Sequence, residues 1–109
     1  MNTMHSLLFG TSGIPLSTPE PNTLNGIRHV RTLGLDAMEL EFVRSVNIAE
    51  GKTELVRKAA KENSIALTCH GQYFVNLNAQ DQETLKQSIQ RILLASKTAS
   101  ACGAWSICY

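Results

Sequence analysis

Four short apolar segments alternate along this chain with three amphipathic segments. The apolar segments cover residues 7–11, 37–43, 65–70 and 105–109 and have the length and composition of buried strands. Strands that alternate with helices at this spacing indicate βαβ units, whose right-handed crossovers build a parallel sheet. The pattern therefore predicts an α/β protein whose sheet is either open and twisted or part of a barrel.

The segments between the strands carry the capping residues and the apolar spacing of helices. Thr23 can cap the first helix and Gly34 can end it, and the second helix is expected from about residue 52 to residue 63. Asp81 opens the third and longest helix, which is expected to end near Gly103. The apolar stripes expected to face the sheet are Leu24, Ile27, Val30 and Leu33; Leu55, Val56, Ala59 and Ala60; and Leu85, Ile89, Ile92, Leu93, Ala99 and Cys102.

Alternation along the strands distinguishes the two kinds of sheet. Glu39 and Glu41 share one face of the second strand, opposite large apolar residues, and His70 lies on the small or polar face of the third strand. A sheet buried by helices on both faces has continuous apolar strands, whereas a barrel interior opens into a polar site. We therefore expect a barrel rather than an open sheet. Residues 1–109 are expected to form a single N-terminal portion of that domain, without an internal boundary.

Charge and cysteine content argue against several classes of protein. Ten basic residues against nine acidic ones leave a net charge of +1, and no basic stripe indicates nucleic-acid binding by this segment alone. The three cysteines have no CxxC spacing and we expect no secretory leader, so reduced thiols and a cytoplasmic location are expected. No apolar run approaches the ~20 residues that span a bilayer, so no membrane association is expected.

His70 is the first candidate functional residue, because barrel enzymes place their chemistry at the carboxyl ends of strands. A histidine there can bind a catalytic metal, or it can cap the strand by bonding the loop backbone. Glu39 and Glu41 repel each other on their shared face, so one of them is expected to be protonated or paired. They could face metals or a sugar hydroxyl, but we favour an ion pair with Arg44 or with a partner on a further strand.

Three further candidate side chains lie in the loops that follow the strands. Arg44 suits phosphate recognition, and it is equally consistent with an ordinary surface arginine. Tyr73 can stack against a nucleotide and Asn76 can hold a phosphate oxygen. The alternative is that both residues only fix the conformation of the loop.

Other polar groups are not assigned to a site. The run 10–13 lacks the lysine and the spacing of a P-loop, so we reject phosphate binding there. His5 and His29 are expected to be solvated. The third helix is expected to have a solvated face made of Lys86, Gln87, Gln90 and Arg91.

Three runs of residues follow one another as they do in endonuclease IV. They are residues 10–17 (GTSGIPLS), 34–39 (GLDAME) and 70–77 (HGQYFVNL). The chain resembles the archaeal-like branch of that family over essentially its whole length, and its most specific part is the H-x-x-Y-x-[IV]-N-L run. The family consists of (β/α)8 barrels of the xylose isomerase-like superfamily, which cut duplex DNA on the 5′ side of abasic sites in base excision repair. The resemblance implies that the chain is an incomplete (β/α)8 TIM barrel, with the first three βα units and the start of the fourth strand. It also implies this activity, with a cluster of three zinc ions, for a full-length parent protein.

The resemblance also implies roles for individual residues. His70 would be a zinc ligand, and Tyr73 would lie near the abasic site where the damaged nucleotide leaves the stack. Asn76 would stabilise the loop or contact the DNA backbone, and Arg44 would reach DNA from the second loop. The first strand ends in Gly-Thr-Ser, where many relatives have a histidine, and the chain stops at Tyr109, before the family's next zinc-binding histidine.

One histidine cannot hold a zinc cluster, so no catalytic residue is assigned to this segment and the chain alone is expected to be inactive. Its open sheet edges are expected to favour self-association. The nearest alternative function is a sugar-phosphate isomerase or epimerase on the same barrel, with Glu39 or Glu41 near the substrate and one divalent metal. The other alternative is a non-catalytic half-barrel that associates with itself.

Overall fold

Each of the four predicted strands enters one parallel sheet in the computed structural model, which describes residues 6–109. The strands lie in sequence order, β1-β2-β3-β4, and each pair of neighbours is parallel. A helix makes each crossover, so the fold consists of consecutive βαβ units. In chain order the elements are β1 (Gly10–Ser12), α1 (Thr23–Thr32), β2 (Ala37–Glu41), the 3-10 helix η1 (Glu50–Lys52), α2 (Thr53–Glu62), β3 (Ala66–His70), α3 (Gln82–Ala101) and β4 (Ile107–Cys108).

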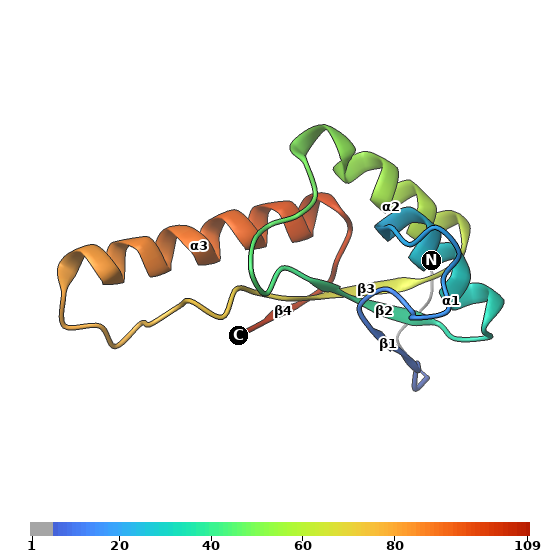
Figure 1. Cartoon of the computed structure of the whole chain (residues 1–109), viewed down its shortest axis with the longest axis horizontal. Helices are drawn as coiled ribbons and strands as arrows, with labels where there is room; N and C mark the ends of the chain where they lie inside the picture. Colours follow the sequence, from blue (N-terminus) through green and yellow to red (C-terminus); the bar gives the residue numbers. More distant parts are fainter. Residues whose placement is uncertain (1–5) are drawn as a thin grey trace.

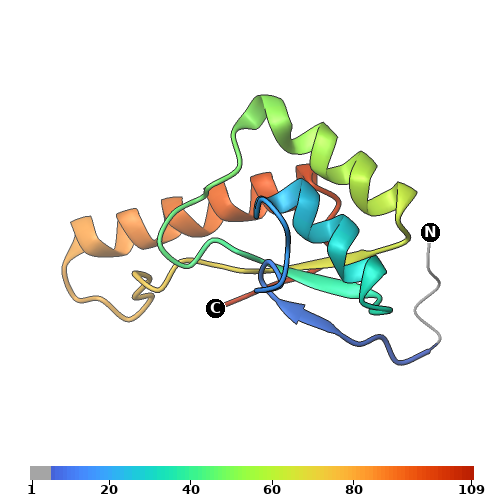
Figure 2. The ribbon, with the colours of Figure 1, turned by 45° about the vertical axis from the view of Figure 1, so that its right-hand side comes forward.

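The helices cover one face of the sheet, and no helix of residues 6–109 covers the other face (Figure 1, Figure 2). Strands β2 and β3 alternate between buried and half-buried residues along their whole length. Met38 and Leu40 are buried on the helix side, whereas Glu39 and Glu41 lie on the open side. The predicted two-faced sheet is therefore confirmed, and the arrangement is that of a partial (β/α)8 barrel whose interior is the open face.

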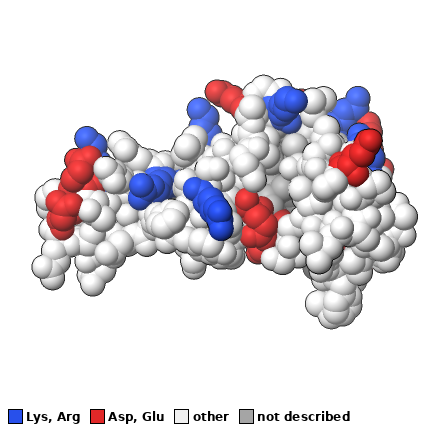
Figure 3. Space-filling view, viewed as in Figure 1, with Lys and Arg blue, Asp and Glu red and all other residues white. Residues whose placement is uncertain are grey.

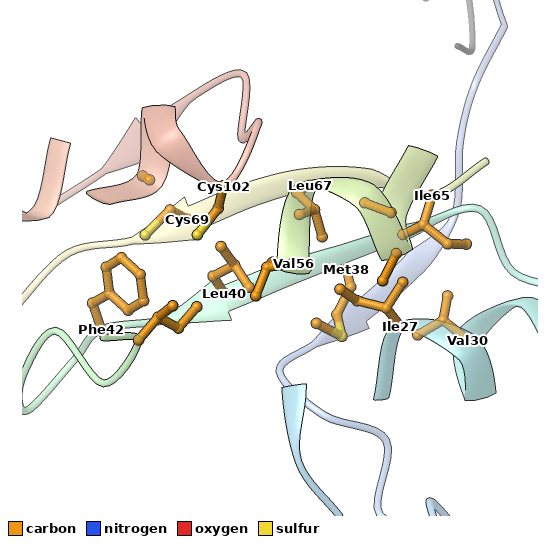
Figure 4. Close-up of a cluster of buried hydrophobic side chains, with 14 of the residues drawn as sticks. Ile27, Val30, Met38, Leu40, Phe42, Val56, Ile65, Leu67, Cys69 and Cys102 are labelled. Carbon is orange, nitrogen blue, oxygen red and sulfur yellow. The ribbon is translucent and has the colours of Figure 1, made fainter. Parts of the chain in front are cut away.

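The core lies between the sheet and the helices (Figure 4). Phe42 and Leu67 are among its largest fully buried side chains. The helices contribute Ile27 and Val30 of α1, Val56, Ala59 and Ala60 of α2, and Ala95 and Ala99 of α3. Because α2 and α3 present mainly small residues to the sheet, both helices can lie close to it. Each fully buried large apolar side chain contributes about 1.5–3 kcal/mol, so this layer is the main source of stability.

Arg31 connects the C-terminal ends of α1 and α2. Its guanidinium forms an ion pair with Asp36, with Nη1 3.1 Å from Oδ1. The same group donates hydrogen bonds to the backbone carbonyls of Asn63 and Ser64, each at 3.0 Å. These acceptors lie in the turn that precedes β3 and Asp36 lies directly before β2, so Arg31 fixes the spacing between the starts of the two strands.

The first strand begins later than the sequence predicts. The apolar run suggested residues 7–11, but β1 is Gly10–Ser12, and Leu7 is 78% exposed. The register explains the shift, because Gly10 pairs with Ala37, the first residue of β2, and earlier residues have no strand residue beside them. Gly10 is also required by the packing, since a Cβ at this position would overlap the carbonyl oxygen of Ala37.

The caps of α1 and α3 differ in how well the sequence predicted them. The cap of α1 is Asn22 rather than Thr23, because the Asn22 side chain accepts a hydrogen bond from the Asn25 backbone at 2.8 Å. Thr23 is instead the first residue of the helix. Asp81 caps α3 as predicted, and its Oδ2 accepts from the Thr84 backbone at 3.0 Å.

Two polar side chains that were predicted to be solvated are bonded within the chain. The Nε2 of His29 lies 2.8 Å from the Ser17 hydroxyl, which links α1 to the loop after β1. Arg91 of α3 donates to the backbone carbonyl of Phe74 at 2.7 Å. His5 lies outside the described residues.

Helix α3 buries only part of its predicted apolar stripe. Ala95 and Ala99 are buried, but Ile89 and Leu93 are 45% and 63% exposed, so their predicted burial is wrong. Figure 1 shows the reason, because the first half of α3 extends beyond the strands. An apolar stripe is buried only where a sheet lies beneath it, and β4 provides only two residues.

Although α3 has 20 residues, no helix in the described part of the chain is long and apolar enough to cross a membrane.

We expect Gly10→Ala to destabilise the fold by about 1–3 kcal/mol, because the added methyl group would push β1 away from Ala37. Urea unfolding followed by circular dichroism would measure the change in the free energy of unfolding. Gly51→Ala is the matched control, since a Cβ there has no atom within 4 Å. Equal midpoints for the two variants would contradict the close approach of β1 and β2.

Candidate functional site

The polar residues of the open sheet face meet at the carboxyl ends of the strands. Ser12 pairs with Glu39 across β1 and β2. Glu41 pairs with His70 across β2 and β3, and His70 pairs with Cys108 across β3 and β4. Because the strands are parallel, these ends form one edge of the sheet, next to the loops that follow the strands. The prediction that the two glutamates and His70 share the polar face is confirmed.

His70 is held by its own loop in one defined tautomer. Its Nδ1 lies 2.7 Å from the carbonyl oxygen of Gly71, which can only accept, so Nδ1 carries the proton. When the ring is neutral, this arrangement leaves the lone pair on Nε2. Tyr73 packs against the ring edge to face, with the centroids 5.7 Å apart. A histidine oriented by a backbone carbonyl in this way has the form of a metal ligand.

Ser12 connects the two glutamates of β2. Its hydroxyl donates to Glu41 Oε1 at 2.9 Å and is 3.3 Å from Glu39 Oε1. A hydrogen bond with Glu41 raises the pKa of Glu39, and partial burial and repulsion from the Glu41 charge add to this effect. The Ser12 hydroxyl and the nearby His70 act in the opposite direction. The pair therefore retains a proton more readily than two separate carboxylates would.

The predicted ion pair between these glutamates and Arg44 is not formed by residues 6–109, so that prediction is wrong. Arg44 is exposed in the bend that follows β2, where solvent can hydrate its guanidinium. The two glutamates are instead bonded to Ser12 on the neighbouring strand. A partner for them on a further strand stays a prediction.

Hydrogen bonds to its backbone fix the first half of the loop of residues 71–81. The Tyr73 backbone donates to the Val43 carbonyl at 2.9 Å, which joins this loop to the bend that contains Arg44. Arg91 binds the Phe74 carbonyl from α3. The side chain of Tyr73 is nevertheless 65% exposed. Tyr73 and Arg44 are thus presented by two joined loops at the edge where His70 ends its strand.

Asn76 acts within the loop. Its Oδ1 accepts a hydrogen bond from the Asn78 backbone at 3.0 Å, which is an Asx turn. Its backbone N–H donates to the buried hydroxyl of Ser88 in α3 at 2.9 Å. Of the two roles that the sequence left open, this geometry matches the one in which Asn76 fixes the loop.

The site offers one well-oriented nitrogen ligand and no complete metal-binding group. Among residues 6–109, no set of three or more His, Cys, Asp or Glu side chains is arranged to hold a metal ion. His70 fits a metal as a single ligand, because no side chain or backbone group of residues 6–109 forms a hydrogen bond with its Nε2. On the face seen in Figure 3, basic and acidic side chains are interspersed without a continuous basic stripe.

Sequence analysis missed three members of the site. Ser12 and Cys108 are the last residues of their strands and, like His70, lie on the polar face. The alternation along the strands could have identified both residues. Cys108 Sγ lies 4.0 Å from Glu39 Oε2. Gly71 is required because a Cβ there would overlap the ring of Tyr109, and no local sequence signal indicates that contact.

Comparison with known proteins gives one family and one curated relative. Residues 27–108 match the family model described as xylose isomerase-like TIM barrel. An uncharacterized protein of Methanocaldococcus jannaschii, MJ0133, is 34% identical over 103 residues. The match covers 94% of this chain but only 36% of that protein, so the chain spans about a third of the relative's length.

Several solved structures share the fold, including an endonuclease and a sugar epimerase. Endonuclease IV from Thermus thermophilus superposes with a TM-score of 0.67 and 18% identity, over 87% of this chain and 36% of that structure. D-psicose 3-epimerase, crystallised in the presence of D-fructose, superposes with a TM-score of 0.62 and 20% identity, over 81% of this chain and 31% of that structure. At these identities the likeness concerns the fold, and it agrees with the partial barrel.

The geometry also predicts which thiols react. Burial raises the pKa of Cys69 to about 12 and that of Cys102 to about 11, whereas Cys108 is exposed. At pH 8 a thiol with a pKa near 12 is ionised in only about one molecule in ten thousand, so alkylation there should be negligible. We expect iodoacetamide to modify Cys108 rapidly and the other two cysteines only after unfolding, as measured by peptide mass spectrometry. Cys108→Ser should remove the fast phase, and rapid labelling of Cys69 would contradict the buried core.

Proposed function

Because the chain belongs to the family of xylose isomerase-like TIM barrels, we propose that it forms part of a zinc-dependent, endonuclease IV-like enzyme. The proposed reaction is hydrolysis of the phosphodiester 5′ of abasic sites in duplex DNA, as part of base excision repair. The observation that supports it best is His70, whose Nδ1 is bound to the Gly71 carbonyl and whose Nε2 is left free beside the exposed Tyr73.

In this proposal each residue of the loop edge has a separate task. His70 would bind zinc through Nε2, and the Gly71 carbonyl would keep the imidazole in the correct tautomer. When bound, the metal would supply an activated water and would stabilise the charge that develops on the phosphate. Arg44 would contact a DNA phosphate, because its guanidinium is exposed and forms no ion pair with the residues described.

Tyr73 is proposed to occupy the space next to the abasic site. Its ring is exposed, while its backbone is fixed to Val43 and the next carbonyl is fixed to Arg91. A rigid backbone with an exposed aromatic ring can stack in DNA at a small entropic cost, because little of the loop remains to be ordered. Asn76 supports this loop through its bond to Asn78 and its bond from the backbone to Ser88.

The chain alone is proposed to lack nuclease activity. His70 gives it one ligand, whereas a zinc cluster needs several ligands, including bridging carboxylates. The remaining ligands would have to come from the part of the parent protein that this chain does not include. In the parent protein, that further part is proposed to cover the open face and the edges of the sheet. In the isolated chain, self-association is proposed to cover them.

A sugar isomerase or epimerase is the second candidate function, and the carboxyl pair of β2 favours it. Glu39 and Glu41 face the open side of the sheet and are joined by the Ser12 hydroxyl. Adjacent carboxyl groups that can share a proton are suited to bind sugar hydroxyls or to move a proton at carbon. The epimerase fold match is compatible with this alternative.

We expect His70→Ala in the full-length protein to reduce incision of an abasic duplex by about 100-fold or more, because one ligand of the metal site is lost. Metal content measured by inductively coupled plasma mass spectrometry should fall in the same variant. His29→Ala is the control, since His29 contacts Ser17 on the helix side of the fold. Unchanged metal content together with unchanged incision would rule out His70 as a zinc ligand.

We expect Tyr73→Ala to weaken binding of the full-length protein to abasic duplex DNA by about 5–100-fold, because an aromatic stacking surface is lost. Phe74→Ala is a matched control, since the neighbouring ring is equally exposed. Fluorescence anisotropy with abasic and intact duplexes would measure both. If neither variant changes DNA binding and Glu41→Gln abolishes ketose epimerisation, the second candidate function replaces the first.

A further inference from the structure

A cavity of about 260 Å³ lies between α2 and the C-terminal end of α3, away from the candidate site. It is lined by Ile65 and Ala66 at the start of β3, whereas His70 ends the same strand. Four residue steps separate Ala66 from His70, a distance of roughly 13 Å along the strand. The proposed nuclease or epimerase chemistry therefore does not use this cavity.

Two cationic side chains line the cavity without an acidic partner. Arg57 and Lys61 are four residues apart on α2, so they lie on the same face of the helix. Neither forms an ion pair with any residue of the described chain, and no Asp or Glu of residues 6–109 lines the cavity. Like charges at this spacing repel each other, so an anion between them would be favoured.

Apart from Ser64, the rest of the cavity wall is apolar and includes an exposed indole. Ile65, Leu67 and Cys102 are buried residues of the core. Trp105 is 51% exposed, and its backbone N–H donates to the Leu67 carbonyl at 3.0 Å, which fixes the residue beside the start of β3. A half-exposed indole next to apolar side chains can cover one face of a ring.

The side chain of Arg57 lies over Gly103 at the edge of the cavity. A Cβ at position 103 would lie 3.3 Å from Arg57 Cγ, and the φ of +84° also favours glycine there. The aliphatic part of Arg57 thus packs over the turn that ends α3. This packing places the base of the Arg57 side chain at the cavity, although the residue as a whole is exposed.

We propose that this cavity binds a small anion that contains a single ring, such as an aryl phosphate or aryl carboxylate. The ring would lie against Trp105 and the apolar wall, and the charged group would lie between Arg57 and Lys61. A ligand with both groups is favoured over either part alone, because a simple anion leaves the apolar wall uncovered and a neutral ring makes no charged contact with Arg57 and Lys61.

The chain provides its own probe for this cavity, because Trp105 is the single tryptophan of the 109 residues. Phenyl phosphate should change the tryptophan fluorescence in a saturable manner. Inorganic phosphate and phenol should each bind at least about tenfold more weakly, since each lacks one half of the interaction. A non-saturable change, or equal binding of phenol and phenyl phosphate, would overturn the proposal.

Charge variants test the contribution of the two cations. We expect Arg57→Gln combined with Lys61→Gln to weaken phenyl phosphate binding at least about tenfold. Lys58→Gln is the matched control and should change binding less than about twofold, because Lys58 lies on the same helix, pairs with Glu62 and does not line the cavity. Circular dichroism would check the fold of each variant. If the double variant does not fold, the effect of salt on the unmodified chain is the test. Added salt must weaken the binding of phenyl phosphate and leave the binding of phenol unchanged. A failure of either result would overturn the proposal.

Discussion

The parallel pairing of β2 with β3 is the constraint on which the rest of the structure depends. Five consecutive residue pairs join the strands, from Ala37 with Ala66 to Glu41 with His70, whereas β1 and β4 add only three and two pairs. A shift of one residue would turn one strand's buried side chains toward the open face. The helices, the core and the polar edge therefore all follow from this one register.

The same register determines the chemistry that the chain can contribute. It sets His70 beside the carboxyl pair of β2, and the bond between Tyr73 and Val43 continues the pairing into the loops. The result is an edge with one oriented imidazole, a pair of carboxyl groups whose proximity raises the pKa of Glu39, and an exposed aromatic ring. Under both proposed functions, this edge would supply one part of a site that other strands complete.

Much of this arrangement was predictable from the local sequence. The strand and helix order, the two-faced sheet, the cap at Asp81 and the position of His70 at a strand end all follow from short-range patterns. The start of β1 and the exposure of Ile89 and Leu93 were not predictable in this way. Both depend on which neighbouring strand is present, and a residue's own apolar character carries no information about that neighbour.

The sequence by itself determined the order of the elements and which face of each strand is apolar, because alternation and capping act over a few residues. Only the tertiary structure decided what the polar groups do. The Ser12 hydroxyl joins two glutamates from a strand about 30 residues later in the chain, and Arg31 binds carbonyl groups more than 30 residues away. These partners are chosen by the packing of strands and helices against one another, and packing over such distances is set by the whole fold.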